Sequence, residues 1–365
     1  MQQSWLTDSV IANPMSDYAA YRDSRSSWFG RMTGAVVEIV TEEGISGLGF
    51  IGGGKGRAAK VIVDDHFCDL LIGQDSRDIE RLWEQLYRAS IMYGRRGLAI
   101  EAISGIDIAL WDILGKAAGM PVYRLLGGRT KDKLPAYVTG NLTDRHISEG
   151  FRNVKLALPH GPADGEIGLR NNEDLVRRSR ERVGPDGHIM LDCYMSLTVD
   201  YTIELARRLK DYRIRWMEEP VMPDQVDDYR RIRDRVDCMI TGGEHEYTRY
   251  GFRELIEKQA VDVLQPDIYR AGGISELKKI AAMASAYGIP VIPHGIGAPT
   301  YHFVMANVNS PAAEFVDVFA QGGELMLEGE PKPQAGYIEL TDAPGFGYSL
   351  NPRALTGEAR IAPIW

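Results

Sequence analysis

The sequence predicts an α/β protein in which a (β/α) barrel follows a smaller α+β domain. The chain is 365 residues long, which suits one large domain together with a smaller one. Its first third contains a predicted β-hairpin and two amphipathic helices. From about Asp132 onward, short apolar strands alternate with amphipathic helices at intervals of roughly 25 residues, which is typical of parallel βαβ units. Repetition of that unit favours closure into a barrel.

The N-terminal domain, residues 1–130, is expected to contain a hairpin and two helices. A β-branched run at residues 33–41 has a predicted partner at 44–53. One helix begins after Asp78, with apolar residues at helical spacing. A second helix shows the same pattern and ends at Gly119-Met120-Pro121. Their apolar stripes are most simply explained as core.

The barrel domain, residues 131–330, is expected to supply the parallel strands and the helices between them. Strands are predicted at 154–157, 188–192, 215–218, 238–242, 261–264 and 290–292. Helices are predicted near 172–183, 199–209, 226–236, 249–258 and 275–287. Residues 331–365 return to Gly/Pro-rich irregular structure with one short strand at 337–340.

Composition and charge narrow the functional classes. The formal net charge is −9 and no basic stripe is present, so nucleic acid is not an expected partner. No apolar stretch is long enough to span a membrane, and residues 1–8 lack the pattern of a secretion signal. Cys68, Cys193 and Cys238 lie far apart without metal-site spacing, which argues against disulfides and zinc and favours a reducing cytoplasm.

Three predicted strands end in an acidic residue at regular intervals. Asp192, Glu218 and Glu244 follow one another at 26 residues, one βα unit, so we expect them at the same height on adjacent strands. Barrel enzymes carry their active sites at this C-terminal end. Three converging carboxylates repel one another unless a cation lies among them, and all-oxygen ligation selects Mg²⁺.

Two alternatives to this metal set remain open. A single acid at a strand end commonly caps the following helix, although three acids in register favour the metal. Glu219 competes with Glu218 as a ligand. Spacing selects Glu218, and strand alternation is expected to point Glu219 to the other side.

The following strands end in a candidate acid–base pair. Asp267 lies 23 residues after Glu244, and His294 follows 27 residues later. A neighbouring carboxylate fixes the imidazole tautomer and raises its basicity, as a general base at a C–H bond requires. Glu314 ends the next strand of the same ring. Lys155, on an earlier strand, would neutralise a substrate carboxylate, with a solvated lysine as the alternative.

Three further histidines lie near predicted strand ends or loops, namely His160, His245 and His302. Each is a candidate substrate contact, although structural histidines are more common. Arg25 stands in a Ser-rich run and is a weak candidate for an anion site.

These residues resemble the enolase superfamily, and within it the mandelate racemase subgroup. The likeness covers almost the whole chain and includes the metal set, the dyad and the following Glu in family order. It implies a (β/α)7β TIM-type barrel, an α+β cap completed by the C-terminal tail, and one Mg²⁺ per subunit. Within the subgroup the chain is similar to the L-rhamnonate dehydratase family, on motifs that include Ser24-Arg25-Ser26-Ser27-Trp28, His160-Gly161-Pro162, Asp192-Cys193-Tyr194-Met195-Ser196, Gly243-Glu244-His245-Glu246 and Pro293-His294-Gly295.

The resemblance also implies where a substrate binds. Loops around residues 14–28 and 52–56 would fold over the barrel mouth and contact the far end of a sugar acid, with Arg25, Trp28 and Tyr194 among the contacts. The protein is further expected to be a homo-oligomer, with an octamer as one form.

The implied reaction is dehydration of an aldonate to a 2-keto-3-deoxy acid. His294 would remove the C2 proton, which is far less acidic than imidazolium, so the metal must stabilise the enediolate. His294 would then return the proton to the departing 3-hydroxyl on the same face. Glu314, if protonated, would donate a hydrogen bond to the substrate carboxylate, which requires a raised pKa.

Two departures from the family pattern bear on the reaction. Two-base members carry Lys-x-Lys on the second barrel strand, whereas Ala157 follows Lys155 here. This argues against a racemase or epimerase. Rhamnonate dehydratases have a His four residues before the Pro of the Pro-Met-Ser motif, where this chain has Val10. A shorter pentonate such as L-lyxonate is therefore an alternative substrate. A non-catalytic sugar-acid-binding barrel is a further alternative, against which the complete metal set and dyad argue.

Overall fold

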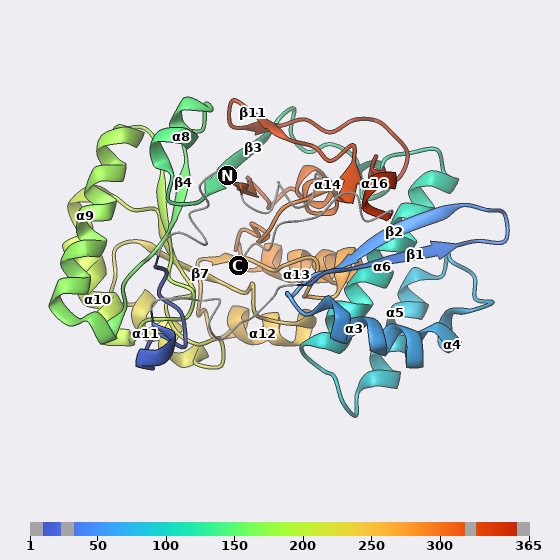
Figure 1. Cartoon of the computed structure of the whole chain (residues 1–365), viewed down its shortest axis with the longest axis horizontal. Helices are drawn as coiled ribbons and strands as arrows, with labels where there is room; N and C mark the ends of the chain where they lie inside the picture. The colour runs from blue at the N-terminus through green and yellow to red at the C-terminus, as the bar shows by residue number, and fades with distance from the viewer. Residues whose placement is uncertain (1–9, 23–32, 318–325, 356–365) are drawn as a thin grey trace.

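The computed structural model describes residues 10–22, 33–317 and 326–355 (Figure 1). The fold is α/β with a parallel sheet. The N-terminal part contains β1 (Ala35–Val40), β2 (Ser46–Ile51), α3 (Gly56–Ile62), α4 (Cys68–Leu71), α5 (Ile79–Ser90), α6 (Leu98–Ala117) and α7 (Val122–Leu125). The sheet-forming part contains β3 (Leu134–Thr139), α8 (Thr143–Ser148), β4 (Val154–Ala157), α9 (Gly165–Val183), β5 (Ile189–Asp192), α10 (Val199–Arg208), β6 (Trp216–Glu218), α11 (Val226–Arg233), β7 (Met239–Gly242), α12 (Thr248–Glu257), β8 (Val263–Leu264), α13 (Gly273–Ala286), α14 (Ala298–Ala306) and β9 (Ala313–Val316). The tail contains β10 (Leu327–Glu328), β11 (Pro333–Gln334), β12 (Tyr337–Ile338), β13 (Ser349–Leu350) and α16 (Pro352–Leu355).

The predicted hairpin is confirmed and packs on helix α6. Strands β1 and β2 pair antiparallel, with Ala35 opposite Ile51. Close approach to α6 depends on glycine, since a Cβ placed on Gly49 would lie 1.8 Å from the carbonyl oxygen of Gly105. Helix α6 is buried along most of its length. Within the part of the chain that the structure describes, no helix is both long and apolar enough to cross a bilayer.

The parallel strands run in chain order from β3 through β4, β5, β6 and β7 to β8, and β9 returns to pair with β3. Next to β8, two isolated parallel bridges join Leu264 to Val291 and Asp267 to His294. These bridges occupy the position of the strand predicted at 290–292. Because parallel strands share their orientation, the residues that follow them gather at one edge.

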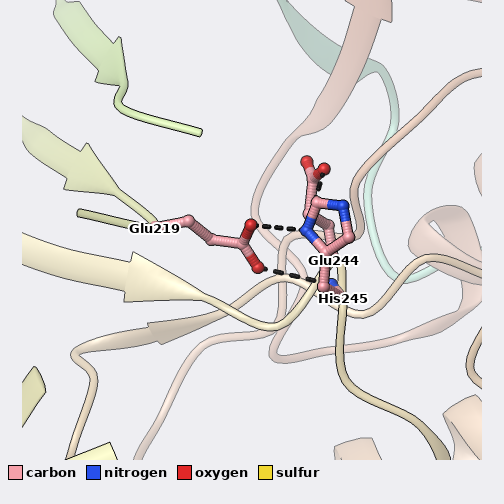
Figure 2. Close-up of side chains that lie close together, drawn as sticks. All are labelled: Glu219, Glu244 and His245. Carbon is pink, nitrogen blue, oxygen red and sulfur yellow. Dashed lines mark hydrogen bonds and ion pairs between the residues drawn. The ribbon is translucent and has the colours of Figure 1, made fainter. Parts of the chain in front are cut away.

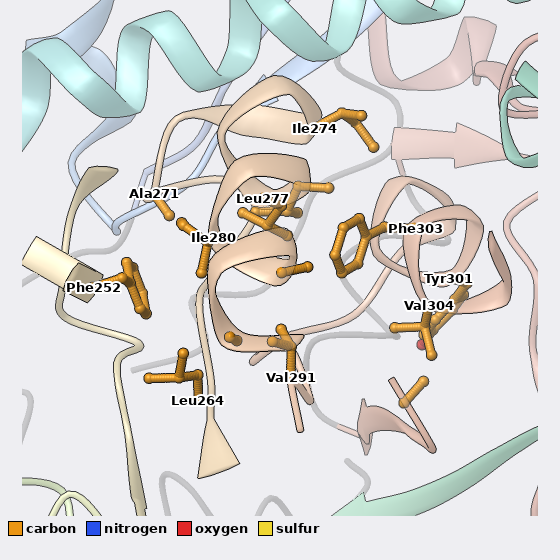
Figure 3. Packing of buried hydrophobic residues seen from close by; sticks show 14 of the residues in the cluster. Phe252, Leu264, Ala271, Ile274, Leu277, Ile280, Val291, Tyr301, Phe303 and Val304 are labelled. Atoms are coloured by element: carbon orange, nitrogen blue, oxygen red, sulfur yellow. The ribbon is translucent and has the colours of Figure 1, made fainter. Parts of the chain in front are cut away.

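Helix α13 joins the sheet to the N-terminal part. Figure 3 shows Ile274, Leu277 and Ile280 of this helix in one apolar cluster with Leu264 of β8 and Phe303 of α14. All five side chains are at most 2% exposed. Burial of an aliphatic side chain of this size stabilises the fold by about 1.5–3 kcal/mol. This packing fixes the loops on either side of α13, which carry Asp267 and His294.

Most predicted helices are confirmed to within a few residues, and α9 is the main exception. The prediction began it near residue 172, whereas the helix starts at Gly165. Two glycines in the first turn hide the pattern, because glycine disfavours helices in general. Gly168 is needed here, since its Cβ would lie 2.7 Å from the Cβ of Asp164.

The tail packs against the N-terminal part through backbone contacts that converge on α6. Asp112, which is fully buried on α6, accepts hydrogen bonds from the backbone N–H of Phe346 (3.0 Å) and of Leu48 on β2 (3.0 Å). Lys116 donates to the same carboxylate at 2.7 Å. Tyr348 donates its hydroxyl to the carbonyl of Leu48 at 2.9 Å. One buried carboxylate thus links helix, hairpin and tail.

We predict that Asp112→Ala lowers the free energy of unfolding by about 3 kcal/mol, because two buried N–H groups and a lysine lose their acceptor. Urea denaturation monitored by circular dichroism measures this change. Asp65→Ala is the control, since Asp65 is exposed and such substitutions stay within about 0.5 kcal/mol. A loss below about 1 kcal/mol in Asp112→Ala would show that water replaces the carboxylate.

Candidate active site

The three predicted metal ligands stand at the C-terminal ends of consecutive strands. Asp192, the last residue of β5, pairs in register with Glu218, the last residue of β6. Glu218 in turn pairs with Thr241 on β7, and Glu244 follows two residues after that strand ends at Gly242. The regular spacing in the sequence therefore places these acids on neighbouring strands at one edge of the sheet.

Asp192 and Glu218 are carboxyl groups whose negative charge is only partly compensated. Burial raises the pKa of Asp192 to about 6 and that of Glu218 to about 8, although Lys155 opposes both shifts. Glu218 accepts hydrogen bonds from Lys155 Nζ (2.5 Å) and Gln265 Nε2 (2.6 Å). Asp192 raises the pKa of Glu218, and Glu244 raises the pKa of both, so a divalent cation among them would relieve repulsion. An all-carboxylate donor set fits Mg²⁺.

Glu244 is surrounded by positively charged or basic groups. Its carboxylate oxygens lie 3.1 Å from His294 Nε2, 3.3 Å from His245 Nδ1 and 3.6 Å from Arg270 Nη1. Burial alone would raise the pKa of Glu244, but His294, His245 and Arg270 outweigh it and lower the pKa. Glu244 is therefore a carboxylate and can act as a metal ligand.

Glu219 does not point away from this group, so the prediction from strand alternation is wrong. Its backbone has φ of 41°, in the left-handed region, which ends the extended geometry after Glu218. Figure 2 shows the Glu219 carboxylate directed at His245, with 2.6 Å to Nδ1 and 3.3 Å to the backbone N. Glu219, Glu244 and His245 each offer a ligand atom within 4.8 Å of the others. A nitrogen ligand suits Mg²⁺ less well than a third carboxylate.

Asp267 and His294 form the predicted dyad. The Asp267 carboxylate lies 2.8 Å from His294 Nδ1 and accepts a second hydrogen bond, 2.7 Å long, from the backbone N–H of Tyr269. Burial alone would lower the pKa of His294, but Glu244 and Asp267 outweigh it and raise the pKa to about 10. The Asp267 contact leaves Nε2 of the imidazole facing Glu244.

Lys155 and Glu314 are fully buried and paired. Lys155 Nζ lies 2.8 Å from Glu314 Oε1 as well as contacting Glu218. Gly295 N–H donates to the other Glu314 oxygen at 2.8 Å, and Thr139 also donates to this carboxylate. Burial would raise the pKa of Glu314, but Lys155 outweighs it and lowers the pKa. The raised pKa that a protonated Glu314 would require is therefore not met here, because these donors stabilise the charged form.

The predicted substrate contacts differ in their positions. The Tyr194 ring packs edge-on against His245 at 5.5 Å, and the backbone N–H of Tyr194 donates to Asp192 at 3.0 Å. His160 is half-buried after β4, 3.3 Å from Asp164. Arg25 and Trp28 lie outside the described residues.

His302 lies apart from this group and has a packing role. It is 2% exposed, accepts a hydrogen bond from the backbone N–H of Tyr123 at 3.1 Å and packs edge-on against Phe346. Burial lowers its pKa to about 3, so the ring is neutral. The expectation of a substrate contact here is not supported, because helix α14 turns this side chain toward the tail.

Two polar residues at the site were missed by sequence reasoning. Gln265 precedes Asp267 by two residues, which is the spacing of one strand face, and it donates to Glu218. That spacing was available as a signal. Arg270 lies three residues after Asp267 and reaches Glu244. Its position follows from the turn after β8, which has no clear signature in the sequence.

The comparisons with known proteins cover nearly the whole chain. Residues 140–354 match the family described as enolase C-terminal domain-like. Residues 27–127 match the N-terminal domain of the mandelate racemase / muconate lactonizing enzyme family. L-rhamnonate dehydratase of Saccharopolyspora erythraea is 42% identical over 360 residues, 96% of this chain and 92% of that relative.

Solved structures of this family are also similar to the chain. Rhamnonate dehydratase from Gibberella zeae complexed with Mg has a TM-score of 0.91 and 43% identity, covering 100% of this chain and 93% of that one. A racemase from Streptomyces coelicolor A3(2) with bound magnesium has a TM-score of 0.83 at 28% identity, covering 98% of this chain and 96% of that one. The chain therefore belongs to the enolase superfamily and, within it, to the mandelate racemase / muconate lactonizing enzyme family.

Proposed function

We propose that this protein is a Mg²⁺-dependent dehydratase of a sugar acid, an aldonate, of the L-rhamnonate dehydratase type. The observation that carries the proposal is the 3.1 Å contact between His294 Nε2 and Glu244. A basic imidazole, steadied by Asp267, thus adjoins a carboxylate of the candidate metal set. The similarity to rhamnonate dehydratases at 42–43% identity supports the substrate class.

In this proposal Asp192, Glu218 and Glu244 hold the metal. Mg²⁺ bound there would stabilise the negative charge that develops on the substrate carboxylate when the C2 proton leaves. The burial of Asp192 and Glu218, with pKa values raised to about 6 and about 8, supports a cation at this position.

The chain's own residues supply the proton transfers. If Glu244 binds the cation, its charge would no longer hold a proton on His294, and Nε2 would then accept the C2 proton while Asp267 holds the other ring nitrogen. The protonated His294 would then give that proton to the departing 3-hydroxyl, so both events occur on one face of the substrate. Lys155, with its pKa raised by Glu218 and Glu314 against the effect of burial, stays charged and offsets negative charge beneath the site. The product is a 2-keto-3-deoxy acid.

The proposal also covers the closure of the barrel, the cellular location and the oligomeric state. The return of β9 to β3 supports a closed (β/α)7β barrel over residues 131–330, with residues 1–130 and 331–365 forming the cap. The described cysteines are free, which supports a cytoplasmic location. We expect a homo-oligomer, as the family resemblance implies.

L-lyxonate is a second candidate substrate on a specific observation. Val10 stands where a histidine is expected in the family, and it is 41% exposed. A valine cannot hydrogen-bond a distal hydroxyl. A racemase is disfavoured, because the Ala157 side chain offers no second base on the opposite strand.

A panel of aldonates that includes L-rhamnonate and L-lyxonate tests the function directly. Incubation with Mg²⁺ should yield a 2-keto-3-deoxy product, detected by NMR, from at least one member. Recovery of a substrate with inverted C2 configuration would instead identify an epimerase. No conversion of any member would favour a non-catalytic binding protein.

We predict that His294→Asn lowers the rate of dehydration by at least about 10⁴-fold, on the scale of removing a catalytic residue. It should also abolish solvent-deuterium exchange at C2, because the base is lost. NMR in D₂O measures both. His188→Asn is the control, since His188 is exposed and should retain wild-type rates. Continued exchange at C2 in His294→Asn would assign the base to another residue.

A paired substitution separates Glu218 from Glu219 as the metal ligand. We predict that Glu218→Gln weakens Mg²⁺ binding at least about 10-fold, because one charged ligand is lost, whereas Glu219→Gln changes it less. Isothermal titration calorimetry on substrate-free protein measures the affinity. A larger loss in Glu219→Gln would transfer the ligand role to the cluster of Glu219, Glu244 and His245.

A further inference from the structure

Four side chains at the site form a closed ring of contacts. Asp267 Oδ2 lies 2.8 Å from His294 Nδ1, and His294 Nε2 lies 3.1 Å from Glu244 Oε2. Glu244 Oε1 lies 3.6 Å from Arg270 Nη1, and Arg270 Nε lies 3.7 Å from Asp267 Oδ2. Acidic and basic groups alternate around this ring, so each carboxylate has a basic group on both sides.

Arg270 is the permanent cation of the ring. Its side chain is 15% exposed, and an arginine keeps its charge at any pH at which a protein functions. Without it, two carboxylates would contact the same imidazole with no fixed positive charge between them. Like charges in a buried site repel one another more strongly than they do in water. The guanidinium therefore counteracts a force that would drive Asp267 and Glu244 apart.

The backbone holds Arg270 in this position. The Arg270 N–H donates to the Asp267 carbonyl at 3.0 Å, which closes the turn after β8. Nη1 donates to the Glu244 carbonyl at 3.2 Å, so the side chain spans from one strand end to the next. Within the described residues Nε has no hydrogen-bond partner, although it is buried. Because Nε donates no hydrogen bond to the neighbouring Asp267, the effect of Arg270 on Asp267 is electrostatic.

The N-terminal part reaches the same guanidinium through Glu101 of α6. Glu101 is 5% exposed and accepts a hydrogen bond from the Tyr247 hydroxyl at 3.2 Å. Burial raises the pKa of Glu101, and the positive charge of Arg270 opposes that shift. Gly53 of the loop at residues 52–56 lies directly on this carboxylate, with no space for a Cβ. Glu101 thus joins the loop at residues 52–56 to Tyr247, and the charge of Arg270 acts on the same carboxylate.

We propose that Arg270 is a positioning residue for the dyad, which holds Asp267 against His294 by occupying the space between Asp267 and Glu244. The expected effect of Arg270 on the reaction rate rests on the proposed function. The expected effect on the contact between Asp267 and His294 does not depend on that function. Lysine would retain the charge at this position but lacks the planar fork of the guanidinium, whose separate nitrogens lie near Glu244 and Asp267.

The first test needs no substrate and no metal. Crystal structures of metal-free wild type, Arg270→Gln and Arg270→Lys would give the separation of His294 Nδ1 and Asp267 Oδ2. We expect 2.8 Å in wild type and, in Arg270→Gln, a separation beyond the hydrogen-bond limit of about 3.5 Å. Arg270→Gln with the contact intact would overturn the proposal, whatever its activity.

The second test measures kinetics on an aldonate that the wild type dehydrates. We expect kcat of Arg270→Gln to fall about 10- to 100-fold, as when a residue supporting a catalytic group is lost. KM should stay within about threefold, because substrate binding is not removed. Exchange of the C2 proton should fall in parallel with kcat, and Arg270→Lys should recover part of both rates. A rise in KM at unchanged kcat would contradict the positioning role.

Arg249→Gln is the matched control. Arg249 pairs with the buried Glu276 outside the site and is 22% exposed, close to the exposure of Arg270. It should lose thermal stability but keep kcat, KM and the dyad contact. Equal loss of kcat in Arg249→Gln would show a general structural effect and overturn the proposal. Absence of turnover in wild type would reject the dehydratase function and leave the crystallographic test of Arg270 intact.

Discussion

Compensation of buried negative charge at the strand ends is the constraint on which the rest of the site depends. Six acidic side chains gather there, and five of them are at most 5% exposed; they are Asp192, Glu218, Glu219, Glu244, Asp267 and Glu314. Burying an uncompensated carboxylate costs several kcal/mol, more than most single contacts supply. The basic residues around them are therefore required for folding as well as for chemistry.

The compensation is divided between two groups of residues. In the first group, Lys155 lies between Glu218 and Glu314. In the second group, Arg270 and His294 lie between Glu244 and Asp267. Compensation is least complete at Asp192 and Glu218, because burial raises their pKa values to about 6 and about 8. A cation held by the proposed ligands would lie next to both groups of residues. If Glu218 turned to the metal, Lys155 would still be paired with Glu314.

The parts of this arrangement that follow from periodicity could be predicted from the sequence. One βα unit has a nearly constant length, so spacing located Asp192, Glu218 and Glu244, and the next strands located Asp267 and His294. The hairpin and α6 followed from apolar patterns in the same way. Long, regular elements carry their own signal because every residue in them repeats the same geometry.

The parts that depend on a single backbone angle or on tertiary contacts could not be predicted. Glu219 turns toward His245 because one residue adopts a left-handed φ, which alternation does not anticipate. The charge state of Glu314 depends on Lys155 from a strand that lies far away in the sequence. The role of His302 could not be predicted either. Only the packing of α14 on Tyr123 distinguishes a buried ring from a substrate contact.

The proposed function assigns the reaction and the choice of substrate to different parts of the chain. In that proposal the strand-end acids, the dyad and Lys155 act on the carboxylate end of a sugar acid, which all aldonates share. In the proposed reaction one face of the substrate meets His294, and Ala157 leaves the opposite strand without a second base. The family resemblance implies that discrimination among aldonates would then come from the far end of the substrate, at the loop at residues 52–56, whose Gly53 lies on Glu101.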